Sequence, residues 1–180
     1  IILGEAQLGL AGTSNLSKMK EAAAAFNMAK SLNPDSKIKS RLDTGIENLR
    51  VILVNSAVED QNKESYALAS QKLYEAYLVS PKDTSYLYYA AGNLVNGHDY
   101  DTALGYYEKL LDLGYKGIQT QYFATDKNTG EEVLFNNKED RDVSVKFAEY
   151  INPQDRKTES VEGDILQKVT LIYINKGETE

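Results

Sequence analysis

The residues best placed to do chemistry lie in Asn96-Gly97-His98-Asp99-Tyr100-Asp101, where one imidazole and two carboxylates are close in sequence. Such a group could hold a metal ion, but a metal site needs three or four ligands that converge in a defined geometry. The same residues favour a turn between two helices, because Asn-Gly and Asp suit turn backbone. We therefore interpret the segment as a turn and predict no metal site there.

Other catalytic patterns are missing from the sequence. It has no Cys, and its one His cannot build a cage of several imidazoles. No Ser or Thr lies in a nucleophile-elbow pattern, and no Gly-rich phosphate loop occurs. The acidic run Glu139-Asp140-Arg141-Asp142 suits a solvated helix start, where carboxylates favour the helix dipole. We predict a protein that is not an enzyme, with no catalytic residue and no cofactor.

Composition narrows the class of partner. The 27 acidic and 20 basic residues give a formal charge of −7, whose excess lies entirely in residues 81–180. An acidic chain disfavours nucleic-acid binding, which needs clustered Lys and Arg. A hydrophobic content of 42% is too high for a disordered chain. No apolar run approaches the ~20 residues that span a bilayer, so we expect no membrane span and a protein or peptide partner.

One spacing recurs along the chain. A small residue is followed four positions later by a large apolar residue, and three positions further on by Ala or Leu. The second and third copies are offset by 34 residues. The three copies are Ala22, Phe26 and Ala29; Ala69, Leu73 and Ala76; and Ala103, Tyr107 and Leu110.

This pattern resembles the tetratricopeptide repeat (TPR), a 34-residue helix-turn-helix unit. The resemblance implies a mainly α fold, a TPR-like α-solenoid of antiparallel helix pairs, to which residues outside the repeat add a small β-hairpin plus helix insertion. Residues 1–117 would hold three repeats (3–36, 50–83 and 84–117, with an extended helix over 37–49), 118–162 the insertion, and 163–180 the first helix of a truncated fourth repeat. We expect the array to continue beyond both ends.

The extension between the first two repeats has helical periodicity. Between residues 36 and 61, apolar side chains recur every three or four positions, which predicts one long helix. Gly45 lies within it and could mark a bend or break instead. Helix starts are indicated by Asp35-Ser36, by Asp83-Thr84 and by Ser160.

Residues 118–162 do not fit the repeat. They predict a β-hairpin whose turn places Gly130 at positive φ. Asn137 is expected to cap a helix that runs to Ile151 and ends before Pro153, with a polar linker from 154 to 160. Similar insertions occur in repeat proteins of bacterial cell envelopes. That resemblance implies a periplasmic or envelope location, with the cytoplasm as the alternative.

The best candidate site is the groove that first helices line in this repeat. Its expected ligand-binding residues are Val51, Val54, Val58, Gln61, Asn62, Tyr88, Val95 and Asn96. We predict a non-catalytic scaffold that binds a peptide or protein segment there. The insertion or a neighbouring unit could instead cover the groove. The alternative function is a structural or self-associating module that uses the apolar last helix to form a homo-oligomer. Small-molecule or metal binding ranks third.

Two residue types allow further interpretation. Asn15, Asn62, Asn96 and Asn175 hold the same place in four units, and we favour left-handed helix stops there over a peptide clamp. Tyr66, Tyr100 and Tyr107 fall at core positions of the repeat. Core packing is therefore preferred to sugar or base stacking for the many tyrosines.

Overall fold

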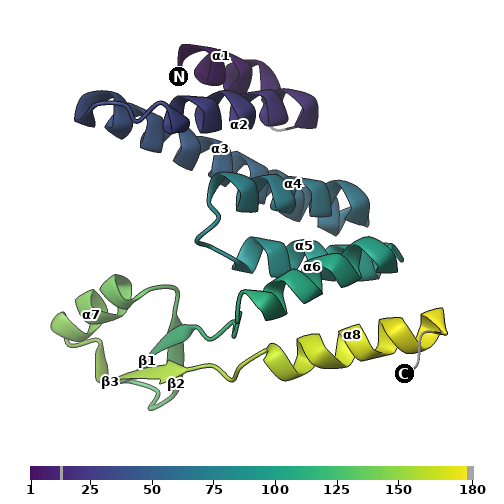
Figure 1. Ribbon diagram of the computed structural model, residues 1–180. Coiled ribbons are helices and arrows are strands. Elements are labelled where there is room, and N and C mark those ends of the chain that lie inside the picture. Colours follow the sequence, from purple (N-terminus) through teal and green to yellow (C-terminus); the bar gives the residue numbers. More distant parts are fainter. Residues whose placement is uncertain (13, 178–180) are drawn as a thin grey trace. The chain divides into compact units, whose positions relative to one another are not determined.

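The computed structural model describes residues 1–12 and 14–177, most of which are helical (Figure 1). The mainly α fold class with a small sheet is confirmed. The helices are α1 (Ile2–Ala11), α2 (Leu16–Ser31), α3 (Ser36–Asn62), α4 (Tyr66–Val79), α5 (Ser85–Asn96), α6 (Tyr100–Asp112), α7 (Lys138–Lys146) and α8 (Glu162–Lys176). The strands are β1 (Thr120–Asp126), β2 (Glu132–Phe135) and β3 (Tyr150–Lys157).

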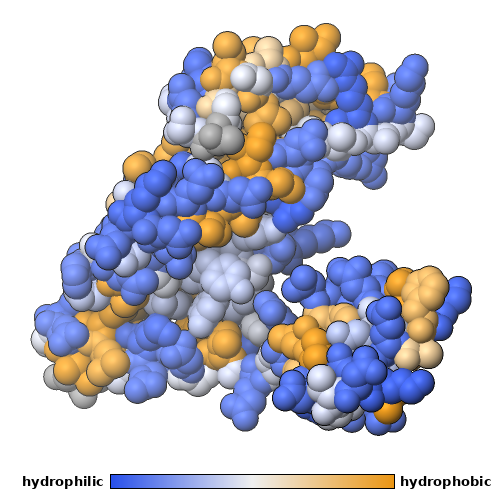
Figure 2. Space-filling view, turned by 180° about the vertical axis from the view of Figure 1, so that it is seen from behind, coloured by the Kyte–Doolittle hydropathy of each residue, from blue (hydrophilic) through white to orange (hydrophobic). Residues whose placement is uncertain are grey.

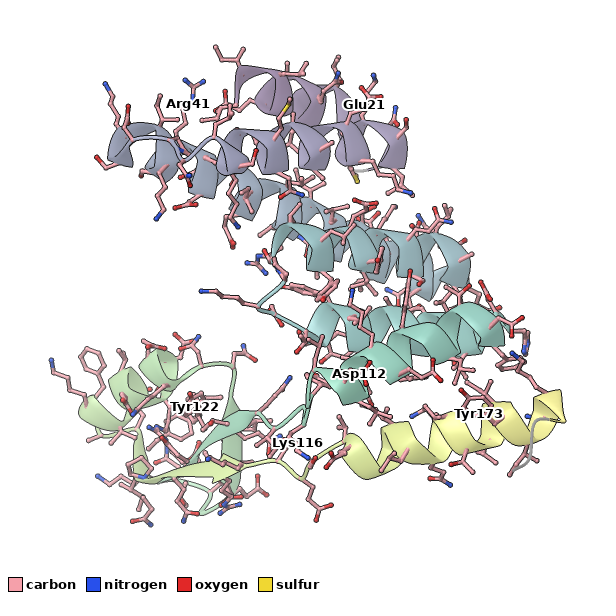
Figure 3. All side chains as sticks on the ribbon, in the orientation of Figure 1. Glu21, Arg41, Asp112, Lys116, Tyr122 and Tyr173 are labelled. Carbon is pink, nitrogen blue, oxygen red and sulfur yellow. The ribbon has the colours of Figure 1, made fainter. Side chains whose placement is uncertain are left out.

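The chain forms two compact units. Unit 1 comprises Ile1–Tyr115 with Lys168–Glu180, and unit 2 comprises Lys116–Gln167. In unit 1 each helix from α1 to α6 packs on the next one in sequence. The C-terminal part of α8 joins this unit through α6: Tyr173 points toward α6 and its hydroxyl donates to Glu108 (Figure 3). Lys176 Nζ also lies 2.8 Å from Asp101 Oδ1.

The predicted spacing marks buried positions in unit 1. The small residues Ala22, Ala69 and Ala103 are fully buried, as the close approach of two helices requires. The large residues four positions later, Phe26, Leu73 and Tyr107, are buried as well. The recurring residues therefore form the core between the paired helices.

The turns after α3 and α5 have equivalent backbones 34 residues apart. Glu64 and His98 have positive φ angles of 58° and 62°. The amides of the next residues, Ser65 and Asp99, each donate to the carbonyl oxygen five residues earlier, over 2.8 and 2.9 Å. The 34-residue offset, which was predicted from side-chain types, thus also relates two turns with the same backbone structure.

The prediction of left-handed stops at the asparagines was wrong. Asn62 and Asn96 are the last residues of α3 and α5, and the left-handed residues are Glu64 and His98, two positions later. The helix runs through each Asn because the left-handed conformation falls just after the C-cap, not before it. Asn15 has another role, since its side chain accepts a backbone amide hydrogen and caps α2.

The environment of His98 is that of a turn. Its Nδ1 lies 2.9 Å from Tyr100 Oη. Within the described part of the chain, no group of three or more His, Cys, Asp or Glu residues is placed to hold a metal ion. Tyr100 is exposed and Tyr66 half-buried, whereas Tyr107 is buried. The core position predicted for Tyr100 was therefore wrong, because its ring turns outward to His98.

The long helix over the extension is confirmed. α3 runs without interruption from Ser36 to Asn62, and Asp35 caps it by accepting the Ile38 amide hydrogen over 3.0 Å. Gly45 does not break the helix. It leaves space for the ring of Phe26 from α2, which a Cβ at Gly45 would approach to 2.9 Å.

Unit 2 is an antiparallel three-stranded sheet with the order β2-β1-β3. The predicted hairpin is confirmed, and Gly130 in its turn has a φ of 75°. Helix α7 packs against the sheet. Arg141 of α7 is almost fully buried and pairs with Asp155. Its Cζ lies 5.5 Å from the ring centre of Tyr122, a residue of β1 that Figure 3 labels.

The helix predicted from Asn137 to Ile151 was only half right. Asn137 does cap α7, since its side chain accepts the Asp140 amide hydrogen over 2.8 Å. The helix ends at Lys146, however, and residues 154–157 of the predicted linker belong to strand β3. Val143, Phe147 and Ile151 have the four-residue spacing that is typical of an apolar helical face, but all three side chains are exposed.

Backbone geometry explains why the helix ends early. Ala148 has a φ of 59°, which turns the chain back toward the sheet. Tyr150 then pairs with Asp126 in β1. Pro153 is tolerated in β3 because this is an edge strand and its register shifts opposite Ala124.

Glu75 of α4 makes the stability of unit 1 depend on pH. Burial raises the pKa of its carboxyl, and Lys20, whose Nζ lies 3.8 Å away, opposes part of this shift. Because this pKa is raised in the folded state, the protonated form of Glu75 favours folding. The stabilisation is fully present when the pH is below the unfolded-state pKa. This contribution is lost as the pH rises through the folded-state pKa.

Replacing Glu75 by Gln, which carries no charge at any pH, is therefore expected to raise the Tm at pH 7. The gain should shrink toward about pH 4, where the carboxyl is largely protonated. Thermal unfolding monitored by circular dichroism between pH 4 and pH 8 measures this. Glu59→Gln, at an exposed position of α3, is the control and should follow the wild-type profile. A lower Tm for Glu75→Gln at pH 7 would show that the pairing with Lys20 outweighs burial.

Candidate binding groove

The residues predicted to line a groove come from helices α3 and α5 of unit 1. Four of the eight, Gln61, Tyr88, Val95 and Asn96, line one cavity of about 220 Å³. Val54, Val58 and Asn62 lie on α3 outside this lining, with Val58 about half exposed. The first helices of the second and third predicted repeats thus meet at one hollow.

The cavity has more lining residues than the sequence predicted. They share a polar and aromatic character: three amide side chains, three tyrosines and a single charged group. The full lining is Gln61, Tyr88, Tyr89, Gly92, Asn93, Val95, Asn96, Tyr107 and Lys168. Such a surface suits a neutral ligand with hydrogen-bonding groups, because few charges are available to pair with an ionic one.

Val51 lies at a different place. It lines a second cavity, of about 660 Å³, together with residues of α1 and α3. Two of its lining residues, Glu5 and Arg41, form a salt bridge. Nε and Nη2 of Arg41, which is labelled in Figure 3, donate to the two carboxylate oxygens of Glu5. The eight predicted residues therefore do not all line the same cavity.

The approach of α3 to α5 is fixed beside the groove. Arg50 of α3 donates to the hydroxyl of Tyr86 on α5, and its guanidinium lies 5.8 Å from the centre of that ring. Glu47 accepts from the same guanidinium one helical turn earlier. Burial raises the pKa of the Tyr86 hydroxyl, so this group stays neutral and can accept the Arg50 hydrogen bond at neutral pH.

Aromatic rings form one wall of the cavity. The ring centres of Tyr88 and Tyr89 lie 5.7 Å apart, and Tyr88 has the same separation from Tyr115. Burial, with smaller contributions from the two neighbouring tyrosines, raises the pKa of Tyr115 to about 12. The Tyr115 hydroxyl therefore remains protonated and uncharged over the physiological range.

Asn93 lies at the boundary between the cavity and the core. Only 4% of its surface is exposed. Its Nδ2 donates to the carbonyl oxygen of Tyr89 over 2.9 Å and to Gln61 Oε1 over 3.3 Å. Its Oδ1 is buried and has no hydrogen-bond partner among the described residues. A buried acceptor without a partner lowers the stability of the fold, because it has lost its hydrogen bonds to water and gained none in their place.

The predicted set lacks five of the lining residues: Tyr89, Gly92, Asn93, Tyr107 and Lys168. Asn93 falls between the core residues Ala90 and Leu94, and a polar residue beside a core stripe is the signal that could have found it. Lys168 lies on α8, and its position at the cavity follows only from how α8 packs in unit 1. No local sequence pattern carries that information.

Comparison with known proteins adds no relative. No protein-family model, curated protein or solved structure matches the chain. The resemblance to tetratricopeptide repeats therefore rests on the residues of the chain itself. Across residues 1–12 and 14–177, none of the helices combines the length and the apolar character needed to cross a bilayer.

Proposed function

We propose that unit 1 is a non-catalytic, TPR-like interaction module that binds a peptide or protein segment across α3 and α5. One observation carries this proposal: Gln61, Tyr88, Val95 and Asn96, which come from two helices and were selected as a groove, line one cavity. A cavity of about 220 Å³ suits a side chain of a bound segment. On α3, three residues before Gln61, Val58 supplies an exposed apolar side chain.

The polar lining favours a segment over an apolar small molecule. Amide side chains at the cavity offer donors and acceptors, and tyrosines combine an apolar ring with a hydroxyl. Recognition of an extended chain uses both kinds of group, since its backbone must exchange hydrogen bonds with water for hydrogen bonds with the module.

Selection from a displayed library of random peptides, each about a dozen residues long, tests the proposal. We expect the full 180-residue protein to enrich related sequences, and Val58→Glu to weaken their binding at least about tenfold, because a charge would be buried against the segment. Leu68→Glu on α4 is the matched control: Leu68 and Val58 are 46% and 51% exposed, but Leu68 is not on the proposed face. Titration calorimetry with a synthetic enriched peptide measures the affinities.

Equal binding by the wild-type protein and Val58→Glu would place the ligand elsewhere. A library that yields no enriched peptide would contradict the proposed function as a whole. Circular dichroism of each variant shows whether a loss of binding reflects unfolding.

Self-association is the second candidate function, and exposed apolar side chains on the first and last helices of unit 1 favour it (Figure 2). On α8, Leu171 and Ile174 are half exposed. Ile2 and Leu3 on α1, Met28 on α2 and Leu32 at the C-cap of α2 are more exposed still. Two different apolar surfaces would allow head-to-tail association. Sedimentation velocity over a range of concentrations separates the two functions, since a strict monomer that still binds peptide supports the groove.

A further inference from the structure

Asn93 lines the cavity, and only one kind of hydrogen-bonding group of its side chain is left unused. Both hydrogens of its Nδ2 are used, one by the Tyr89 carbonyl oxygen and one by Gln61 Oε1. A carbonyl oxygen can only accept, so the amide cannot be turned over without placing two acceptors against each other. What remains of Asn93 is Oδ1, which is an acceptor.

This acceptor has no partner in the described part of the chain. It is a buried oxygen of a side chain that lines a cavity. Unpaired buried groups lower stability and are rare in folded proteins, so each one needs a physical reason. A ligand group that enters the cavity and carries a hydrogen to donate would remove the cost.

The neighbouring amide completes the chemistry. Gln61 accepts from Asn93 through Oε1, which leaves its Nε2 as a donor on a second residue of the same cavity lining. An acceptor and a donor side by side complement a primary amide, which has an N–H donor and a C=O acceptor in the same plane. A carboxylate offers only acceptors, so it would meet Asn93 Oδ1 with repulsion.

The space around this pair suits a flat group. Gly92 lines the cavity, and no atom lies within 4 Å of the position that a Cβ there would occupy. The rings of Tyr88 and Tyr89 provide apolar surface for the methylene groups that carry the amide.

We propose that this cavity is a specificity subsite for a neutral primary amide, the side chain of Gln or Asn in a bound peptide, and that it rejects the matching carboxylates of Glu and Asp. Asn93 Oδ1 accepts from the amide nitrogen, and Gln61 Nε2 donates to the amide oxygen. This inference rests on the proposed function, because it names the side chain that the proposed groove selects.

The first test uses only the wild-type protein, so no variant needs to fold. Peptides enriched from the random library are expected to share a Gln or Asn at one position. In a synthetic enriched peptide, Gln→Glu at that position should lower the affinity at least about tenfold, and Gln→Met, which has a similar shape but no donor, should lower it as well. Titration calorimetry at neutral pH measures both.

The second test uses Asn93→Leu, which removes the acceptor. We expect this variant to lose the discrimination between the Gln and Glu peptides while its Tm stays the same or rises by about 2–4 °C, because an unpaired buried oxygen is gone. A merely structural Asn93 would instead lower the Tm on replacement and leave the peptide preference unchanged.

The outcomes separate the amide subsite from the proposed function. Peptides that bind, are weakened by Val58→Glu and show no preference for Gln or Asn over Glu or Asp would overturn the amide subsite alone. A library without any enriched peptide would overturn both the subsite and the groove.

Discussion

Replacing Lys72 by Met is expected to lower the free energy of unfolding by about 3–5 kcal/mol. Lys72 lies on α4 with 3% of its surface exposed. Its Nζ is 2.6 Å from Asp60 Oδ2 and donates to the hydroxyl of Ser56, which joins α4 to α3. Met has a similar length but no charge, so the variant leaves the Asp60 carboxylate with little water and no counter-charge.

The control for this prediction removes both charges. In Lys72→Met/Asp60→Leu no buried charge is left alone, and replacing a buried ion pair by apolar residues is often neutral or stabilising. The double variant should therefore recover most of the loss. Urea denaturation followed by circular dichroism measures the three proteins. A single variant within about 1 kcal/mol of wild type would show that water reaches Asp60 freely.

Phe26 gives the second large effect. Its ring is fully buried in unit 1, and Gly4 of α1 and Gly45 of α3 approach it closely. A Cβ built on either glycine would lie 2.6 Å or 2.9 Å from a ring carbon. Phe26→Ala is expected to cost about 3–5 kcal/mol, because the cavity it leaves is bounded by three helices that cannot all move inward.

Gly45→Ala distinguishes packing from helix propensity at the same place. In an open helix, Gly→Ala stabilises by up to about 1 kcal/mol. At Gly45 the new methyl would overlap the Phe26 ring, so we expect a net loss of stability. Gly105→Ala in α6 is the matched control: no atom lies within 4 Å of the point that its new methyl would occupy, and it should stabilise.

Urea denaturation again supplies the measurement. A stabilised Gly45→Ala would mean that Phe26 can move aside, and the packing described for α1, α2 and α3 would then be wrong. Subtracting the change in unfolding free energy of Gly105→Ala from that of Gly45→Ala removes the gain in helix propensity that both substitutions share.

Sequence periodicity predicted the helices of unit 1 well because their burial pattern is local. A helix repeats every 3.6 residues, and most side chains that recur at this interval in α3 are buried, such as Leu42, Leu49 and Leu53, whereas Ile38 near its start is exposed. Asp35 and Asn137 marked helix starts for the same reason, since a cap acts on backbone amides two or three residues away.

Unit 2 shows where periodicity fails. Val143, Phe147 and Ile151 have helical spacing, yet the chain reverses at Ala148 and the last of the three belongs to a strand. Strand β3 pairs with β1, which lies far from it along the chain, and such pairing has no local sequence signal. A tertiary contact decided the conformation there, not the propensity of the segment.

The candidate groove was predictable in part. First-helix faces can be selected from the repeat offset, which selected Tyr88 and Val95, and the structure has both residues in the lining of one cavity. The state of Asn93 could not be found in this way, because the lack of a partner for Oδ1 depends on where the Gln61 and Tyr89 groups lie in space. Val51 was assigned to the same groove, but it lines another cavity nearer α1.

The location of a bound peptide tests the central claim most directly. With methyl-labelled protein and an unlabelled enriched peptide, we expect intermolecular nuclear Overhauser effects from the peptide to the Val58 and Val95 methyls. We expect none to Leu3 or Leu171, which are exposed on the first and last helices of unit 1. Effects to Leu171 or Leu3, with none to Val95, would contradict a ligand groove on α3 and α5.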